Sequence, residues 1–234
     1  MSLPKIKHPS FETEVPSTQK KITYRPMLGR EEKILLMAKE SGVDAEIVTA
    51  VKQVVQNCVT DNTDINTLAT FDVDFLFIKI RSISIGSTVN ISHTDEFSNE
   101  VRQFVVNLND VKVTTSEVSN QLKIADGITA TLRYPRAEIY SQPEVIAAEG
   151  TDATDRLMAH CLDKIYEGSK MYDPRENKYE EIVEFLDGLS VEAINQFRMY
   201  LSDVPHLSYT IEFTDSKERA RKIELRTLFD FFQF

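Results

Sequence analysis

Residues 209–232, YTIEFTDSKERARKIELRTLFDFF, resemble residues 89–110, VNISHTDEFSNEVRQFVVNLND. In both segments, runs of alternating apolar and polar residues flank a polar tip, which is the pattern of a β-hairpin. Aligned without a gap, five pairs are identical at one constant offset: Ile91 and Ile211, Thr94 and Thr214, Asp95 and Asp215, Leu108 and Leu228, and Asp110 and Asp230. Each hairpin also follows an expected helix, with Phe77 and Phe197 at the same offset. We therefore hypothesise a duplicated helix-then-hairpin unit.

The other periodic segments indicate an α+β fold, built from helical segments and several short antiparallel β-hairpins. A strand is expected at KKITYRP, residues 20–26, and Asp126-Gly127 predicts a tight turn inside a hairpin over residues 120–134. Helices are expected over residues 30–41, 44–55, 71–86, 144–150, 152–166, 177–189 and 190–204. Within the third of these, FLFIKI also fits a strand, and that alternative stays open.

The first nineteen residues differ from the rest of the chain. They contain Pro4, Pro9 and Pro16 and follow neither regular period, so residues 1–19 are expected to form an extended N-terminal arm, flexible or laid on a partner. Residues 20–234 are expected to form a single α+β domain. A division of this domain into two subdomains, 20–135 and 136–234, is a further option.

Composition excludes several functional classes. The chain has 37 acidic and 27 basic residues, a net charge of −10, so it should repel nucleic acid and anionic lipid. No apolar run is long enough for a membrane span, and the start has no hydrophobic signal core. The protein is therefore expected to stay in the cytoplasm where it is made, unless another protein carries it out. Cys58 and Cys161 lie far apart in apolar helical contexts and fit buried free thiols in a reducing compartment.

A search for catalytic chemistry yields no catalytic, cofactor-binding or metal-binding set. The four histidines are scattered, and seven glycines form no phosphate loop. His160 and Cys161 are neighbours that point about 100° apart on a helix, a poor nucleophile and base pair. The acidic pairs Glu31-Glu32 and Glu180-Glu181 fall in first helical turns, where carboxylates favour the positive end of the dipole.

The hairpin tips allow one metal-binding alternative. His93, Asp95 and Glu96 lie close in the first tip, and Asp215 and Glu218 lie close in the second, so a zinc or hard-cation site is one alternative for the tips. The favoured interpretation is a solvated turn in which Asp95 and Asp215 accept hydrogen bonds from nearby backbone N–H groups.

These residues suggest a family. In chain order, the chain carries PSTQKKITYRPMLGREEKILLMAKES, DFLFIKIRSISIG, LKIADGITATLRYP, LSYTIEF and a closing LFDFF. This order resembles the baseplate proteins of T-even-like tailed phages, which are concerned with the baseplate hub and its assembly. The resemblance covers nearly the whole chain, and its opening part, residues 16–41, is the most specific.

The resemblance implies zinc-ribbon hairpins, because many members carry paired cysteines at the hairpin tips. In this chain the tips read HTDEFSNE and TDSKERAR, without cysteine. The two hairpins are therefore expected to be degenerate zinc-ribbon-like modules, and no metal ligand is carried over to this sequence.

The implied function is non-enzymatic: a hub component or an assembly factor that helps build the baseplate hub of a contractile phage tail. Its partners would be other hub or tail proteins, with no small-molecule substrate and no cofactor. The C-terminal aromatic residues Phe231 and Phe234 are the candidate partner contacts. The expected location is the host cytoplasm during assembly, with the virion tail baseplate as a further location.

Two other functional classes stay open. A hydrolytic tail enzyme acting on the cell wall would have to use the loosely placed carboxylates described above. A nucleic-acid-binding ribbon module is disfavoured by the negative charge.

Overall fold

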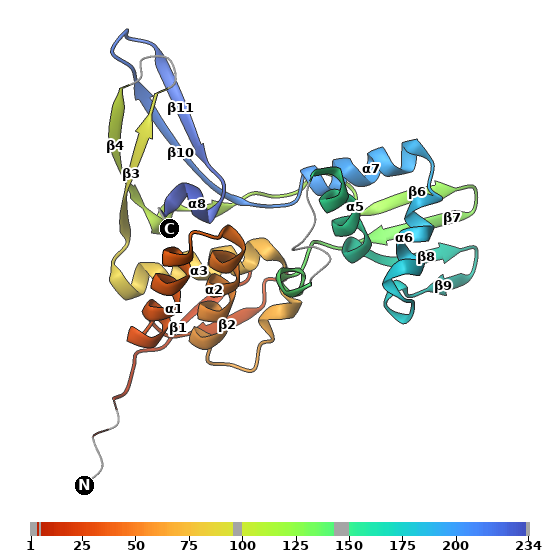
Figure 1. Ribbon diagram of the computed structural model, residues 1–234, viewed down its shortest axis with the longest axis horizontal. Helices are drawn as coiled ribbons and strands as arrows, with labels where there is room; N and C mark the ends of the chain where they lie inside the picture. Colours follow the sequence, from red (N-terminus) through yellow and green to blue (C-terminus); the bar gives the residue numbers. More distant parts are fainter. Residues whose placement is uncertain (1–3, 5, 96–99, 143–149, 233–234) are drawn as a thin grey trace. The chain divides into compact units, whose positions relative to one another are not determined.

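The computed structural model describes residues 4, 6–95, 100–142 and 150–232 (Figure 1). Two compact units divide the chain. Unit 1 comprises residues 1–114 and 206–234, and unit 2 comprises residues 115–205. The alternative subdomain boundary expected between residues 135 and 136 falls inside unit 2. The chain leaves unit 1 after residue 114 and returns to it at residue 206 for the last hairpin.

Unit 1 begins with an antiparallel strand pair followed by helices. Its elements are β1 (Phe11–Glu14), β2 (Lys21–Tyr24), α1 (Gly29–Ser41), α2 (Asp44–Cys58), the 3-10 turn η1 (Ile65–Thr67) and α3 (Thr70–Ile85). Gly42 has a φ of 67° and ends α1, a left-handed conformation that costs glycine little. α3 carries apolar residues around most of its circumference, and Leu76, Phe77 and Ile78 are buried. The alternative of a strand at FLFIKI is therefore excluded.

The expected N-terminal arm is shorter than residues 1–19. β1 pairs with β2 from Phe11 to Glu14, and Val15 is fully buried. The buried carboxylate of Asp72 in α3 accepts hydrogen bonds from the backbone N–H and the hydroxyl of Ser17. Residues 11–17 are therefore an integral part of unit 1, because a distant helix supplies the contacts that the local sequence lacks.

The two similar segments both form hairpins in unit 1. β3 (Thr88–Thr94) pairs with β4 (Val101–Asn107), and β10 (Leu207–Thr214) pairs with β11 (Ala220–Leu225). A single helical turn follows each hairpin, η2 (Leu108–Asp110) and α8 (Leu228–Phe231), and each turn starts with a buried leucine. A short strand, β5 (Lys112–Val113), extends the second hairpin by pairing with β10. The duplicated positions thus occupy equivalent places in two equivalent local structures.

Unit 2 packs helices against a four-stranded antiparallel sheet in the order β6-β7-β8-β9. Its strands are β6 (Gln121–Ala125), β7 (Ile128–Leu132), β8 (Leu162–Glu167) and β9 (Lys170–Tyr172). Its helical elements are η3 (Ala137–Ser141), α5 (Gly150–Cys161), η4 (Pro174–Glu176), α6 (Tyr179–Asp187) and α7 (Val191–Ser202). Both units thus mix helices with short antiparallel sheets, which confirms the α+β class.

One expected helix in unit 2 was too long. The segment over residues 152–166 is helical only to Cys161, and Leu162 to Glu167 form β8. Pairing with β7 on one side and β9 on the other gives β8 its backbone hydrogen bonds, and the local sequence does not reveal this pairing. The expected helix over residues 144–150 lies mostly outside the described residues.

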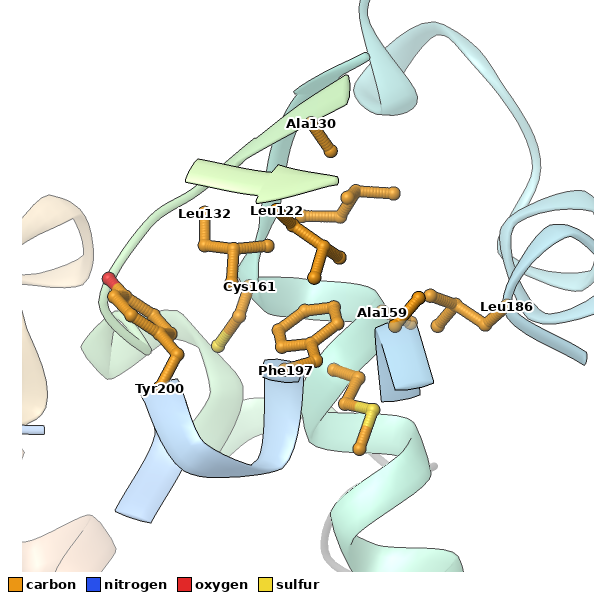
Figure 2. Close-up of a cluster of buried hydrophobic side chains, with 11 residues drawn as sticks. Leu122, Ala130, Leu132, Ala159, Cys161, Leu186, Phe197 and Tyr200 are labelled. Carbon is orange, nitrogen blue, oxygen red and sulfur yellow. The ribbon is translucent and has the colours of Figure 1, made fainter. Parts of the chain in front are cut away.

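The core of unit 2 lies between its sheet and its helices (Figure 2). Phe197 of α7 is fully buried and lies beside Leu122 of β6 in Figure 2. The rings of Tyr200 and Tyr134 stack with centroids 5.9 Å apart. Ser190 caps α7 by accepting a hydrogen bond from the Ala193 N–H at 3.2 Å, as its position before the helix predicted.

A repeated joint connects a strand to a helix in each unit. The residue after β2, Arg25, donates its backbone N–H to the carbonyl of Cys58 at the end of α2, at 2.9 Å. The residue after β7, Arg133, donates to the carbonyl of Cys161 at the end of α5, at 2.8 Å. Each guanidinium also binds the carbonyl of the residue before the cysteine, Asn57 at 2.8 Å and His160 at 2.9 Å. The two units thus share one kind of connection between a strand end and a helix end.

The two cysteines are buried free thiols, as predicted. Burial raises the pKa of the Cys58 thiol to about 11 and that of the Cys161 thiol to about 12. Both thiols are therefore protonated and poorly nucleophilic at neutral pH, which fits a packing role.

Candidate interaction surfaces

The tip of the second hairpin is organised by Asp215. Its Oδ1 accepts hydrogen bonds from the backbone N–H groups of Lys217 and Arg219, each at 2.9 Å. Its Oδ2 accepts hydrogen bonds from Nε of Arg219 at 2.7 Å and from Nε of Arg221 at 3.1 Å. Burial alone would raise the pKa of Asp215, but these hydrogen bonds lower it to about 2. Asp215 is thus an ionised turn-forming carboxylate, which confirms the favoured interpretation of this tip.

A backbone hydrogen bond closes each tip, and in the second tip it joins the Asp215 N–H to the Arg219 carbonyl at 3.0 Å. Asp95 is 3% exposed, and its N–H donates to the carbonyl of Glu100 at 3.0 Å. Glu96 lies outside the described residues. Within the described ranges, no three histidine, cysteine, aspartate or glutamate side chains gather as metal ligands. The zinc-ribbon-like description is therefore not confirmed, and zinc-free protein stays a prediction for elemental analysis.

The two hairpins of unit 1 contact each other through their inner faces. The rings of Phe104 in β4 and Phe213 in β10 lie 5.2 Å apart. The guanidinium of Arg102 lies 5.2 Å from the ring centroid of Phe213 and donates to the Thr214 carbonyl at 2.6 Å. A cation over an aromatic face and a charged hydrogen bond together hold the hairpins side by side.

The outer face of the first hairpin carries no charge. Its exposed side chains alternate along β3 and β4: Thr88, Asn90, Ser92, Thr94, Val101, Gln103 and Val105. Val101 is 64% exposed and Val105 is 69% exposed. We call these seven residues the uncharged face. In a chain with 27% charged residues, a charge-free sheet surface of this length is unusual.

The second hairpin provides an internal comparison, because its strands pair in the same pattern across a tip that is one residue shorter. Its exposed outer positions are Thr210, Glu212, Thr214, Ala220, Lys222 and Glu224. Lys222 and Glu224 form an ion pair at 2.6 Å. In the two registers Val105 lies opposite Asn90, as Glu224 lies opposite Thr210. The fold thus tolerates a charged outer face, so hairpin geometry does not explain the missing charges on the first hairpin.

The C-terminal aromatic cluster differs from its expected role. Phe231 is 2% exposed, because in the single turn of α8 it lies on the same side as the buried Leu228. The ring of Phe232 packs edge-on against Phe77 of α3, with centroids 5.6 Å apart. The structure therefore corrects the prediction that Phe231 is a partner contact. Phe229 is 41% exposed instead, and Phe234 lies outside the described residues.

One carboxylate of each acidic pair at a helix start has a structural role. Glu31 is fully buried and accepts hydrogen bonds from Arg25 at 3.1 Å, from Arg30 at 2.7 Å and from the Leu28 N–H at 2.8 Å. Burial opposes ionisation of Glu31, but these donors lower its pKa to about 2. Glu181 caps α6 by accepting the Lys178 N–H at 2.9 Å. Both positions thus follow the helix-start pattern expected from the sequence.

Comparison with known proteins identifies the family. The family model described as T4 bacteriophage base plate protein matches residues 8–233. The chain belongs to this family. No curated protein and no solved structure matched the chain.

Membership of the bacteriophage baseplate family implies that the chain contacts other phage tail proteins and suggests a location in the virion tail. The uncharged face on β3 and β4 is a surface suited to such contacts, since it would bury valine and neutral polar groups without removing charges from water. No helix of the described ranges is long and apolar enough to cross a membrane.

Proposed function

We propose that this baseplate protein is non-enzymatic and helps build the baseplate hub of a contractile phage tail through protein–protein contacts. It acts either as a hub component or as an assembly factor. Family membership supports the baseplate part of this proposal. The observation that supports contact-based action is the uncharged face, whose equivalent on the second hairpin is charged.

The uncharged face suits a partner for two physical reasons. Burying Val101 and Val105 would remove two largely exposed apolar side chains from water. The neutral side chains Ser92 and Gln103 already bond each other at 2.9 Å, so covering this pair leaves fewer polar groups without partners. The inner face is fixed by the second hairpin, which presents the outer face as a preformed surface.

The non-enzymatic part of the proposal rests on the roles of the candidate carboxylates. Glu31 is held by two arginines, and Glu181 caps its own helix. A hydrolytic tail enzyme would need a pair of carboxylates free to act on a glycosidic bond. Incubation of the purified protein with cell-wall material tests this alternative, and release of soluble sugar fragments would refute the non-enzymatic proposal.

A complementation experiment tests the contact surface. A phage lacking this protein is propagated on cells that supply Val101→Glu/Val105→Glu from a plasmid. Because both positions are exposed, we expect the variant to fold with little change in stability but to support few complete baseplates. Ala220→Glu, which occupies the position of Val101 in the second hairpin, is the matched control and should complement normally. Full complementation by the double variant would overturn the assignment of this face.

Quantitative mass spectrometry of purified particles separates the two forms of the proposal. A few copies per mature particle would identify a hub component. Presence in infected-cell lysate and absence from particles would identify an assembly factor that leaves, and would place its action in the host cytoplasm.

A further inference from the structure

Unit 2 contains an apolar hollow between strand β8 and helix α6. Its volume is about 360 Å³, and its apolar lining includes Leu162 and Ile165 of β8 and Ile182 and Phe185 of α6. Leu162 is buried, whereas the other three side chains are half-buried and keep apolar surface exposed. The hollow is at the small end of the range for ligand sites, so it suits one or two side chains rather than a whole helix.

Two carboxylates, those of Glu167 and Glu181, line this hollow. Glu167 ends β8 and accepts a hydrogen bond from the Tyr172 hydroxyl at 2.8 Å, and Glu181 caps α6 through one of its oxygens. Within the described part of the chain, neither carboxylate forms an ion pair. Lys170 lies opposite Glu167 in the strand register without forming one. The surrounding unit is strongly acidic, with 17 acidic and nine basic residues over 115–205. A basic, apolar segment therefore complements this site in both charge and polarity.

The chain itself carries such a segment at its start. Residues 1–10, the leading segment, contain Lys5 and Lys7 and no carboxylate, and Glu12 is the first acidic residue of the sequence. Ile6, which lies between the two lysines, is 78% exposed. Pro4 and Pro9 favour an extended backbone, which lowers the entropy lost when such a segment is held on a surface.

We propose that the leading segment of one copy binds the hollow of unit 2 of a second copy, with Ile6 inserted among the apolar side chains and its flanking lysines facing Glu167 and Glu181. A contact between two different patches is heterologous, so it joins copies head to tail and can close a ring or extend a row. Ile6 is exposed on unit 1, so the segment is available for binding by a second copy. This inference does not depend on the proposed role in hub building.

A peptide titration tests the site directly. A synthetic peptide of residues 1–10 is added to full-length protein with isotope-labelled isoleucine methyl groups, and NMR shifts are followed. The contact is small, so we expect a dissociation constant on the order of 1 mM, weakening as salt is raised. Shifts should concentrate at Ile165 and Ile182. A peptide with both lysines replaced by glutamate should bind at least about tenfold more weakly, and equal binding of the two peptides would overturn the proposal.

Protein variants provide matched controls. Glu167→Gln/Glu181→Gln removes both charges while keeping the acceptor for Tyr172 and a residue type that can cap a helix, so the fold should be retained. This variant should weaken peptide binding about tenfold. Glu180→Gln changes a neighbouring carboxylate of α6 that does not line the hollow, and it should bind the peptide as the native chain does.

Sedimentation velocity of the full chain tests the second copy as the source. The weight-average sedimentation coefficient should rise with protein concentration, and Ile6→Asp should remove this rise without unfolding, since Ile6 is exposed. A chain that stays monomeric up to millimolar concentration while the peptide still binds would overturn the proposal, because the segment would then belong on its own chain.

Discussion

The replacement of Phe231 by alanine tests whether the C-terminal aromatic cluster is core or contact surface. Phe231 is 2% exposed, whereas Phe229, two residues earlier in the same turn, is 41% exposed. Phe229→Ala is therefore the matched control: it removes the same atoms from the same helical turn at a partly solvated position.

The expected magnitudes follow from burial. Removing a buried phenylalanine side chain typically costs about 3–5 kcal/mol, through lost apolar burial and the cavity that remains. A partly exposed phenylalanine has less to lose, so Phe229→Ala should cost about 1 kcal/mol. For a unit of this size, about 3 °C per kcal/mol predicts a fall in the melting temperature of about 10–15 °C for Phe231→Ala and about 3 °C for Phe229→Ala.

Differential scanning calorimetry is the appropriate assay. The chain has two compact units with separate cores, so two transitions are expected, and only the one that belongs to unit 1 should move. Unit 2 then acts as an internal reference in each experiment. Equal small shifts for the two variants would refute the reasoning and return Phe231 to the list of surface contacts. A shift of both transitions together would show that the units unfold as one.

Three further predictions concern stability. Burial raises the pKa of Asp74 to about 7, so its folded state holds a proton that the unfolded chain has released, and stability should fall as pH rises from about 4 to 7. Asp74→Asn should therefore stabilise unit 1 at pH 8 by about 1–2 kcal/mol, an amount reduced by the partial exposure of this side chain, and should have little effect at pH 4; urea titrations at the two pH values measure this. Deletion of residues 1–10 should leave the melting temperature nearly unchanged, whereas deletion of residues 1–19 removes β1 and the hydrogen bonds of Ser17 to Asp72 and should lower it by more than about 5 °C; equal effects would argue against an integral first strand. Asp203→Ala removes the carboxylate that accepts the Ser116 hydroxyl and the N–H groups of Glu117 and Val118, so the unit 2 transition alone should lose about 2–3 kcal/mol, and an unchanged transition would show that water replaces these bonds.

Local patterns in the sequence predicted the elements whose structure depends on near neighbours. The alternating runs around each polar tip give the two long hairpins, Asp126-Gly127 gives the tight turn between β6 and β7, and Ser190 gives the start of α7. Gly127 has a φ of 77°, a conformation that a turn of this kind requires and that glycine adopts at little cost. In these elements the backbone conformation is encoded within a few residues, so no distant contact is needed to predict it.

The interaction surfaces were harder to predict, because exposure depends on how elements pack. The C-terminal aromatic residues were chosen as contacts from composition alone, but α8 turns Phe231 inward. In the sequence, Val101 and Val105 look like ordinary strand residues. The structure shows that they point to solvent, because β4 pairs with β3 and packs its other face, through Phe104, against Phe213. The gapless alignment of the two segments sets Val101 against Arg221, whereas the strand registers place Val101 at the position of Ala220. The missing charges on the outer face therefore become visible only once the registers are known.

By itself, the sequence determined the α+β class, the two duplicated hairpins, the buried free cysteines and the family, since each of these rests on short-range periodicity or on ordered motifs. Tertiary structure alone decided that Leu162 to Glu167 form a strand, that residues 11–17 belong to unit 1, and that the last hairpin returns to unit 1 after the whole of unit 2. The physical reason is the same in all three cases. The deciding partners are β7 for β8, Asp72 for Ser17 and β5 for β10, and each lies tens of residues away along the chain. No local pattern indicates which distant segment will satisfy a backbone hydrogen bond.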